Sequence, residues 1–146
     1  MLNHALRNVP AEMCRIHICW GNYEGPHDHD IDFAKVAPIL IRAKPMALVV
    51  EAANPRHAHE WTVWRDLKLP DDKVLVAGVL DTSTNYVEHS ELVAERICRF
   101  ADIVGRERVI ASTDCGLGGR IHSQIAWAKL EALARGAALA SKQLWP

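Results

Sequence analysis

Four residues from three distant parts of the sequence carry side chains able to bind a metal ion. His17 and Cys19 form a His-Ile-Cys motif. Glu51 follows two valines, and Cys115 lies in the motif Thr-Asp-Cys-Gly. One imidazole, two thiolates and one carboxylate suit tetrahedral zinc better than magnesium or calcium. A site with three permanent ligands and one replaceable ligand would suit catalysis. The ligands are too widely spaced in the sequence for a zinc finger.

Each of these residues lies in or at the end of a short apolar run that is typical of a buried strand. We expect strands over four ranges: Arg15–Cys19, Met46–Glu51, Val74–Asp81 and Val109–Cys115. Uninterrupted apolar runs are typical of parallel strands covered on both faces. Residues i and i+2 of a strand point to the same side, so His17 and Cys19 should share one face. The carboxyl ends of parallel strands are where the active sites of α/β proteins gather.

Helical patterns alternate with the expected strands. We expect helices over Ile31–Ala43, His57–Leu67, Ser90–Val104 and Ser123–Leu144, of which the second has the weakest pattern. Ser90 is the expected N-cap of the third helix, and Gly105 fits its C-cap. A strand followed by a helix, repeated four times, predicts an α/β fold with parallel strands and right-handed crossovers.

The number of βα units restricts the possible architectures of the chain. We expect residues 1–146 to form one domain of four units, which is half of an eight-stranded barrel. An isolated half would expose two strand edges and one sheet face. The sequence therefore suits an open sheet, a half-barrel that dimerises, or a piece of a longer protein. We favour a half-barrel whose complement is missing or is supplied by a partner.

Bulk composition excludes several classes of function. The chain has 146 residues, 49% of them apolar, and a net charge of -1. A near-neutral chain without a basic run gives no electrostatic reason to expect binding to nucleic acid or an anionic membrane. No apolar run approaches the ~20 residues that span a bilayer, and Met1–Glu12 does not have the pattern of a secretory signal. The cytoplasm is the expected location, where cysteines are thiols rather than disulfides.

Several candidate residues have plainer interpretations. Cys14 and Cys98 are best interpreted as small core residues. Cys19 and Cys115 are open to the same interpretation, and Glu51 to that of a helix cap or ion-pair partner. The tract Pro-His-Asp-His-Asp (26–30) has the residue types of a metal-binding cluster, but it better suits a solvated loop, in which Asp30, or Asp32 just after it, caps the next helix. Asn54 and Arg56 are candidates for contact with a substrate anion. A simple turn that leads into a helix fits these residues equally well, and it would also account for His57 and His59.

The motifs resemble a known family. The segments His17-Ile-Cys19, Val-Val-Glu51, Gly78-Val-Leu-Asp81 and Asp114-Cys115-Gly-Leu occur in this order in the catalytic domain of cobalamin-independent methionine synthase. Glu-Ala-Ala-Asn-Pro-Arg-His (51–57) and Val-Gly-Arg-Glu-Arg-Val-Ile (104–110) are closer to the short bacterial "methionine synthase II" branch, which includes epoxyalkane:coenzyme M transferase-like proteins. The resemblance implies the C-terminal half of a TIM (β/α)8 barrel of the methionine synthase/uroporphyrinogen decarboxylase type.

The resemblance also implies a site and an activity. The ligands of its zinc ion (Zn2+) fall on His17, Cys19, Glu51 and Cys115. Asp81 and Asp114 would be catalytic residues that lie beside the metal ligands or the substrate. The family holds a substrate thiol as a zinc-bound thiolate, which attacks a methyl or alkyl donor. A free alkyl thiol has a pKa near ~8.5 and is mostly protonated at neutral pH, whereas a metal-bound thiol is deprotonated.

The same resemblance limits the activity that can be expected of this chain alone. Methionine synthases carry a histidine soon after the aspartate of the third motif, but Thr-Ser-Thr-Asn follows Asp81 here. Contacts to homocysteine and most contacts to folate come from the first half of the family's barrel. The expected partners are a small thiol, an alkyl or methyl donor, and a second copy or a complementing N-terminal half. The alternatives are an inactive barrel remnant that binds zinc or a partner, and a metal-free relative of uroporphyrinogen decarboxylase.

Overall fold

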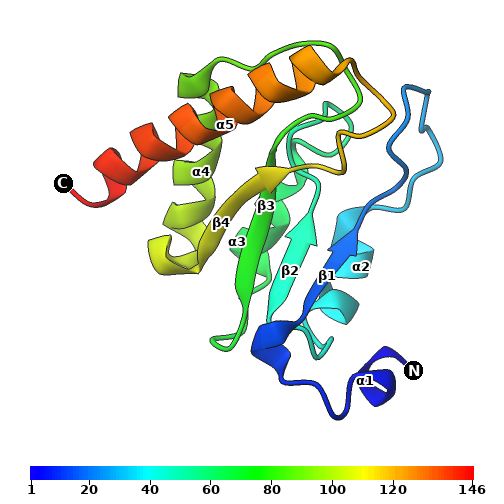
Figure 1. Cartoon of the computed structure of the whole chain (residues 1–146). Coiled ribbons are helices and arrows are strands. Elements are labelled where there is room, and N and C mark those ends of the chain that lie inside the picture. Colours follow the sequence, from blue (N-terminus) through cyan, green and yellow to red (C-terminus); the bar gives the residue numbers. More distant parts are fainter.

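The computed structural model describes residues 1–146 and contains one sheet of four parallel strands in the order β1-β2-β3-β4. The strands are β1 (Arg15–Ile18), β2 (Ala47–Val50), β3 (Val74–Leu80) and β4 (Val109–Thr113). Their arrowheads lie at the same end of the sheet in Figure 1. All four predicted strands are confirmed, each slightly shorter than expected. As a result, Cys19, Glu51, Asp81 and Asp114 are the first residues after their strands.

The chain has five α-helices, one more than predicted, and two of the four predicted ones are shorter than expected. They are α1 (Leu2–Ala5), α2 (Phe33–Leu40), α3 (Val63–Asp66), α4 (Ser90–Val104) and α5 (Ser123–Leu144), with 3-10 turns η1 (Ala11–Met13), η2 (Glu60–Thr62) and η3 (Arg106–Arg108). The two long helices have the predicted bounds. The predicted helix over His57–Leu67 is only partly confirmed, because the 3-10 turn η2 and the short α3 together cover Glu60–Asp66. No helix is both long and apolar enough to cross a bilayer.

Two predicted helix caps need correction. His89, not Ser90, is the N-cap of α4, and its imidazole accepts a hydrogen bond from the backbone N–H of Glu91 at 3.3 Å. At α2, neither Asp30 nor Asp32 caps the helix with its side chain. Instead, Glu60 Oε1 accepts the N–H of Phe33 at 2.7 Å. The predicted C-cap at Gly105 is confirmed, with a φ of 95° that favours glycine.

The helices cover only one face of the sheet, as Figure 1 shows for α2 to α5. On that face the strands and helices share one apolar core of 17 buried residues, which includes Leu48, Leu75, Phe33, Ile97 and Phe100. The other face has no helix over it.

The residues of the uncovered face differ in exposure. His17, Val49, Val76 and Ile110 form one row across the four strands. Ile110 is 52% exposed there, whereas Val49 and Val76 are 8% exposed. The free edges of β1 and β4 and this uncovered face are the surfaces that an isolated half-barrel is expected to expose.

Gly78 lets β3 and β4 approach closely near their carboxyl ends. A Cβ atom at this position would lie 2.3 Å from Asp114 Oδ1, 2.8 Å from Asp114 Cα and 2.9 Å from the Val50 carbonyl oxygen. The pairing of β3 with β4 also shifts register between Gly78 and Leu80. Glycine is therefore required to leave room for the buried carboxylate of Asp114.

Gly78→Ala is expected to lower the free energy of unfolding by ~3 kcal/mol, because two of the three close atoms belong to the backbone and cannot rotate away. Chemical denaturation followed by circular dichroism measures the change. Gly118→Ala is the matched control, since its Cβ would meet nothing within 4 Å. Equal stability of the two variants would show that Gly78 is not needed for this packing.

Candidate metal centre

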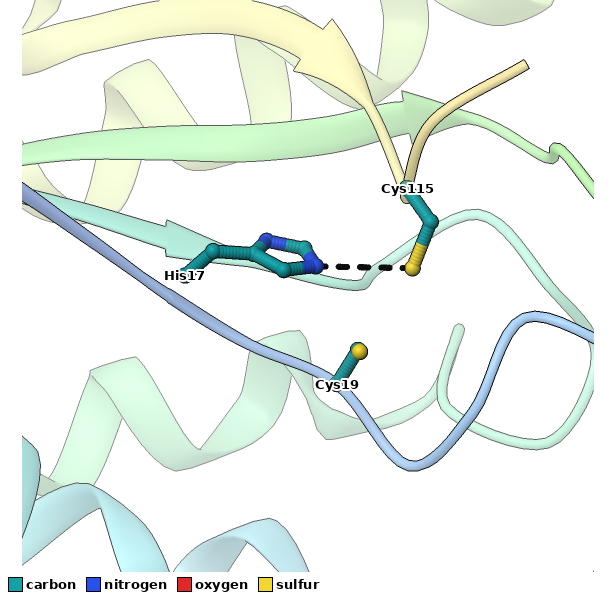
Figure 2. A group of neighbouring side chains, drawn as sticks. All are labelled: His17, Cys19 and Cys115. Carbon is teal, nitrogen blue, oxygen red and sulfur yellow. Dashed lines mark hydrogen bonds between the residues drawn. The ribbon is translucent and has the colours of Figure 1, made fainter. Parts of the chain in front are cut away.

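The carboxyl end of the sheet brings the four predicted ligands into one cluster. His17 lies on β1, Cys19 and Glu51 directly follow β1 and β2, and Cys115 is the second residue after β4. The ligand atoms of His17, Cys19 and Cys115 all lie within 4.8 Å of one another, and Figure 2 shows them turned toward a common point. Cys115 Sγ lies 3.4 Å from His17 Nε2 and 3.1 Å from Glu51 Oε1.

The cluster is buried on one side and open on the other. Glu51 and Cys115 are buried, whereas His17 and Cys19 lie on the uncovered sheet face and are exposed. Burial raises the pKa of the Cys115 thiol, and the nearby Glu51 carboxylate and Cys19 raise it further. Two thiolates and a carboxylate at this spacing repel one another unless a cation lies between them. The donor chemistry therefore fits a divalent, thiophilic metal ion such as zinc.

Asp114 ties the end of β4 to the loop that follows β2. Its Oδ1 accepts the backbone N–H groups of Ala52 at 2.8 Å and Ala53 at 3.0 Å. Its Oδ2 accepts both the backbone N–H and the side-chain amide of Asn54, at 2.8 and 3.0 Å. Burial raises the pKa of Asp114 to about 7, and the four donors oppose that shift because they stabilise the carboxylate. These bonds hold the segments that carry Cys115 and Glu51 side by side.

The two predicted substrate residues have different surroundings. Asn54 is 2% exposed, and its Oδ1 accepts the backbone N–H groups of Arg56 and His57 at 3.2 and 3.3 Å. With its amide on Asp114, Asn54 shapes the loop, and its substrate role stays a prediction. Arg56 Nη1 donates to the carbonyls of Tyr23 and Gly25, and its buried Nε has no partner. The substrate role of Arg56 stays a prediction.

Asp81 lies at the same end of the sheet but organises its own loop. Its two oxygens accept hydrogen bonds from the backbone and hydroxyl groups of Ser83 and Thr84. Burial alone would raise the pKa of Asp81, but these donors and the nearby Lys129 outweigh it and lower the pKa. Asp81 forms no hydrogen bond or ion pair with the four candidate ligands. Its catalytic role stays a prediction.

A buried histidine behind Glu51 was not assigned a role from the sequence. His57 is 3% exposed, and its Nδ1 lies 2.7 Å from Glu60 Oε2. Its Nε2 lies 3.3 Å from Asp30 Oδ2 and 3.9 Å from Glu51 Oε2. The indole of Trp20 stacks on its ring at 4.1 Å. Burial alone would lower the pKa of His57, but the neighbouring carboxylates outweigh it and raise the pKa.

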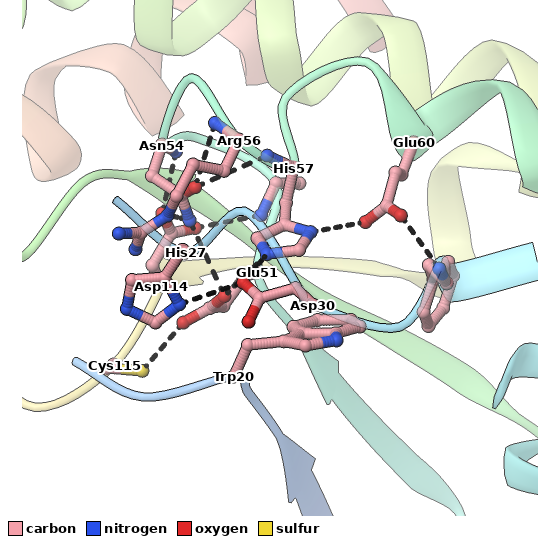
Figure 3. Close-up of polar contacts among 12 residues, drawn as sticks. Trp20, His27, Asp30, Glu51, Asn54, Arg56, His57, Glu60, Asp114 and Cys115 are labelled. Carbon is pink, nitrogen blue, oxygen red and sulfur yellow. Dashed lines mark hydrogen bonds and ion pairs between the residues drawn. The ribbon is translucent and has the colours of Figure 1, made fainter. Parts of the chain in front are cut away.

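The Pro26–Asp30 tract belongs to the same network, so its interpretation as a solvated loop or helix cap is wrong for two of its residues. His27 Nδ1 lies 2.8 Å from Asp30 Oδ2, and the His27 side chain is only 3% exposed. Figure 3 shows this loop meeting the loop of Asn54 and His57 beside Glu51. The only sequence signal was the shared i, i+3 spacing of His27 with Asp30 and of His57 with Glu60.

Comparison with known proteins identifies the relatives of the chain. The family described as "Cobalamin-independent synthase, Catalytic domain" matches residues 35–138. A 2-hydroxypropyl-CoM lyase from Xanthobacter autotrophicus is 27% identical over 167 residues, covering 97% of this chain and 44% of the lyase. A methionine synthase from Saccharolobus solfataricus is 29% identical over 147 residues, covering 98% of this chain and 39% of the synthase.

A solved structure has the same fold. The B12-independent methionine synthase from Shewanella sp. W3-18-1, in complex with selenomethionine, matches with a TM-score of 0.75 at 24% identity and covers 98% of this chain and 42% of that protein. The chain thus spans about two fifths of the length of the relatives it matches. Its four βα units form one half of a TIM-type barrel, which confirms the predicted fold class.

Proposed function

The chain belongs to the family of cobalamin-independent synthase catalytic domains, and on this premise we propose that it takes part in zinc-dependent transfer of a methyl or alkyl group to a substrate thiol, as in methionine biosynthesis. One observation carries the proposal: ligand atoms of His17, Cys19 and Cys115 lie within 4.8 Å of one another, with the Glu51 carboxylate 3.1 Å from Cys115. Zinc, when bound there, would supply the positive charge that keeps a thiol deprotonated at neutral pH.

The residues of the chain have distinct parts in this proposal. His17, Cys19 and Cys115 would hold the metal, because an imidazole and two thiolates favour zinc. Glu51 would be the fourth and replaceable ligand, since Asn54 Nδ2 at 3.5 Å and His57 Nε2 at 3.9 Å from its Oε2 could receive the carboxylate.

The reaction itself is a displacement. The sulfur of the substrate thiol loses its proton to solvent and forms a bond to the donor carbon. The bond from that carbon to the leaving group breaks, and its electron pair leaves with the donor. The similarity to a methionine synthase and a 2-hydroxypropyl-CoM lyase supports a thiol as the acceptor. Homocysteine and a methyl-tetrahydropteroyl donor, as in the methionine synthase reaction, are the first substrates to test.

A second function is supported by the open architecture. The chain spans about two fifths of its relatives, and one sheet face is uncovered. Such a half-barrel could bind zinc, or a complementing N-terminal half or second copy, without turning over substrate alone.

Metal analysis and a simple alkylation assay separate these functions. We expect one zinc per chain by elemental analysis after reconstitution, and faster alkylation of a small thiol by an alkyl iodide with the zinc-loaded chain than with the metal-free chain. Stoichiometric zinc without acceleration would favour the non-catalytic half-barrel. A chain that binds no zinc would contradict both the site assignment and the proposed chemistry.

A further inference from the structure

His27, in the loop between β1 and α2, has an unusual backbone conformation. Its φ is 49°, and no other residue except glycine has a positive φ. Such a conformation is strained for a residue with a side chain, and it persists where the surrounding structure enforces it, often at functional sites. The ring of Tyr23 packs on that of His27, with 4.5 Å between the ring centroids. The loop therefore holds the His27 ring in one definite position.

The two ring nitrogens of His27 have different surroundings. Nδ1 lies 2.8 Å from Asp30 Oδ2, and because an ionised carboxylate only accepts hydrogen bonds, Nδ1 carries a hydrogen. Nε2 has no hydrogen-bond partner, although the side chain is only 3% exposed. His27 Nε2 and Arg56 Nε are the only buried side-chain nitrogen or oxygen atoms of the chain without a partner. Buried polar atoms are nearly always paired, so this nitrogen indicates a place for an atom of a bound molecule.

The loop of His27 lies beside the candidate metal centre. Asn22 Nδ2, in the same loop, donates to the carbonyl of Gly116, the residue after Cys115, at 2.7 Å. In Figure 3 the ring nitrogen bonded to Asp30 faces the buried network, whereas the other nitrogen of His27 points away from it, on the side where Cys115 lies. The free nitrogen is thus at the carboxyl end of the sheet, where the proposed reaction would take place.

His27 differs from the other buried histidine of the network in having a free nitrogen. His57 has none, because its Nδ1 lies 2.7 Å from Glu60 Oε2 and its Nε2 lies 3.3 Å from Asp30 Oδ2. A carboxylate on Nδ1 orients an imidazole and stabilises its protonated form, so the other nitrogen gains and donates the proton. His27 therefore has the arrangement of a group that transfers a proton to or from a bound molecule.

We propose that His27 donates a proton to the leaving atom of the alkyl donor, and that Asp30 positions its ring. The inference rests on the proposed function. As the substrate sulfur forms its bond to the donor carbon, the bond from that carbon to a leaving nitrogen or oxygen breaks. The leaving atom keeps the electron pair of that bond and takes the proton of His27 Nε2. His27 then regains a proton from solvent, which received one from the substrate thiol.

The first test compares two alkyl donors that differ in their leaving atom. The ring oxygen of propylene oxide leaves the carbon as a basic alkoxide that needs a proton, whereas iodomethane releases iodide, which does not. With the zinc-loaded chain and 2-mercaptoethanol, we expect His27→Asn to slow alkylation by propylene oxide about 100-fold and alkylation by iodomethane less than about threefold. Asparagine suits this position because it tolerates a positive φ.

The matched control is His29→Asn, in the same loop, where the side chain is 95% exposed. It should change neither rate. Asp30→Asn should slow the reaction with propylene oxide more than the reaction with iodomethane, since the ring of His27 then loses its orienting carboxylate. A residue with a merely structural role would affect both donors equally.

The second test needs neither metal nor turnover. Nitrogen-15 NMR of the metal-free chain, labelled at histidine and assigned with the His27→Asn variant, should show the neutral His27 ring with its hydrogen on Nδ1 and none on Nε2. The opposite tautomer, or equal slowing of both donors by His27→Asn, would overturn this inference and leave the proposed function intact. A zinc-loaded chain that accelerates neither alkylation would overturn the proposed function and this inference with it.

Discussion

Replacing Cys115 with serine is expected to abolish stoichiometric zinc binding and, with it, any zinc-dependent thiol alkylation. Cys115 Sγ contacts both His17 Nε2 at 3.4 Å and Glu51 Oε1 at 3.1 Å, so it lies at the centre of the cluster. A neutral hydroxyl replaces a thiolate there, and soft sulfur ligands are what select zinc over oxygen-preferring ions. We expect zinc affinity to fall at least ~100-fold, measured by competition with a chromogenic chelator.

Cys19→Ser should have a similar effect, because the Cys19 thiol belongs to the same group of ligand atoms. The matched control is Cys98→Ser. Cys98 is on α4, where its thiol contacts Gln143 at 3.3 Å, away from the carboxyl end of the sheet. The control should keep one zinc per chain. If both Cys19→Ser and Cys115→Ser also kept one zinc per chain, the assignment of the metal ligands would be wrong.

Removal of the Asp114 side chain is expected to cause the largest loss of stability. Asp114→Ala leaves three buried backbone N–H groups, in residues 52–54, without their acceptor. Each unsatisfied buried donor costs roughly 1–3 kcal/mol, and the alanine also leaves a cavity. We expect the free energy of unfolding to fall by ~4 kcal/mol, measured by urea denaturation of the metal-free chain.

Asp102→Ala on the exposed side of α4 serves as the control and should change the free energy of unfolding by less than ~0.5 kcal/mol.

The zinc affinity of Asp114 variants gives a second readout, because Asp114 holds the segment carrying Glu51 next to Cys115. The nearly isosteric Asp114→Asn should fold but bind zinc more weakly, since an amide NH2 then faces backbone N–H donors. Unchanged stability of Asp114→Ala would show that the loop after β2 does not depend on this carboxylate.

The strands and the two long helices could be predicted because their signals are local. An uninterrupted apolar run marks a buried strand, and α4 and α5 carry apolar residues at regular helical spacing along their whole length. The start of α2 could not be predicted in the same way. Its first N–H is accepted by Glu60, which lies 27 residues further along the chain. No local pattern around Asp32 indicates a cap that comes from so far away.

The candidate metal centre was partly predictable for a related reason. Parallel strands bring their carboxyl ends together, so chemically reactive residues at those ends converge whatever their separation in sequence. The contacts that hold the ligands are different. The bonds from Asp114 to residues 52–54 and the packing of His57 against Trp20 depend on how loops fold over one another. Asn54 illustrates the difficulty, since its position suggested substrate contact whereas its bonds run into the protein.

The separation between His17 and Cys115 has a consequence for folding kinetics. These residues lie 98 positions apart, His17 on β1 and Cys115 just after β4, which are the two outermost strands of the sheet. Contacts of such high sequence separation form late, because the entropy of closing the loop between them must be overcome first. The complete ligand set therefore exists only after all four strands have paired. Metal binding then stabilises the completed sheet. The rate at which a chelator removes the ion measures how often the two outer strands separate.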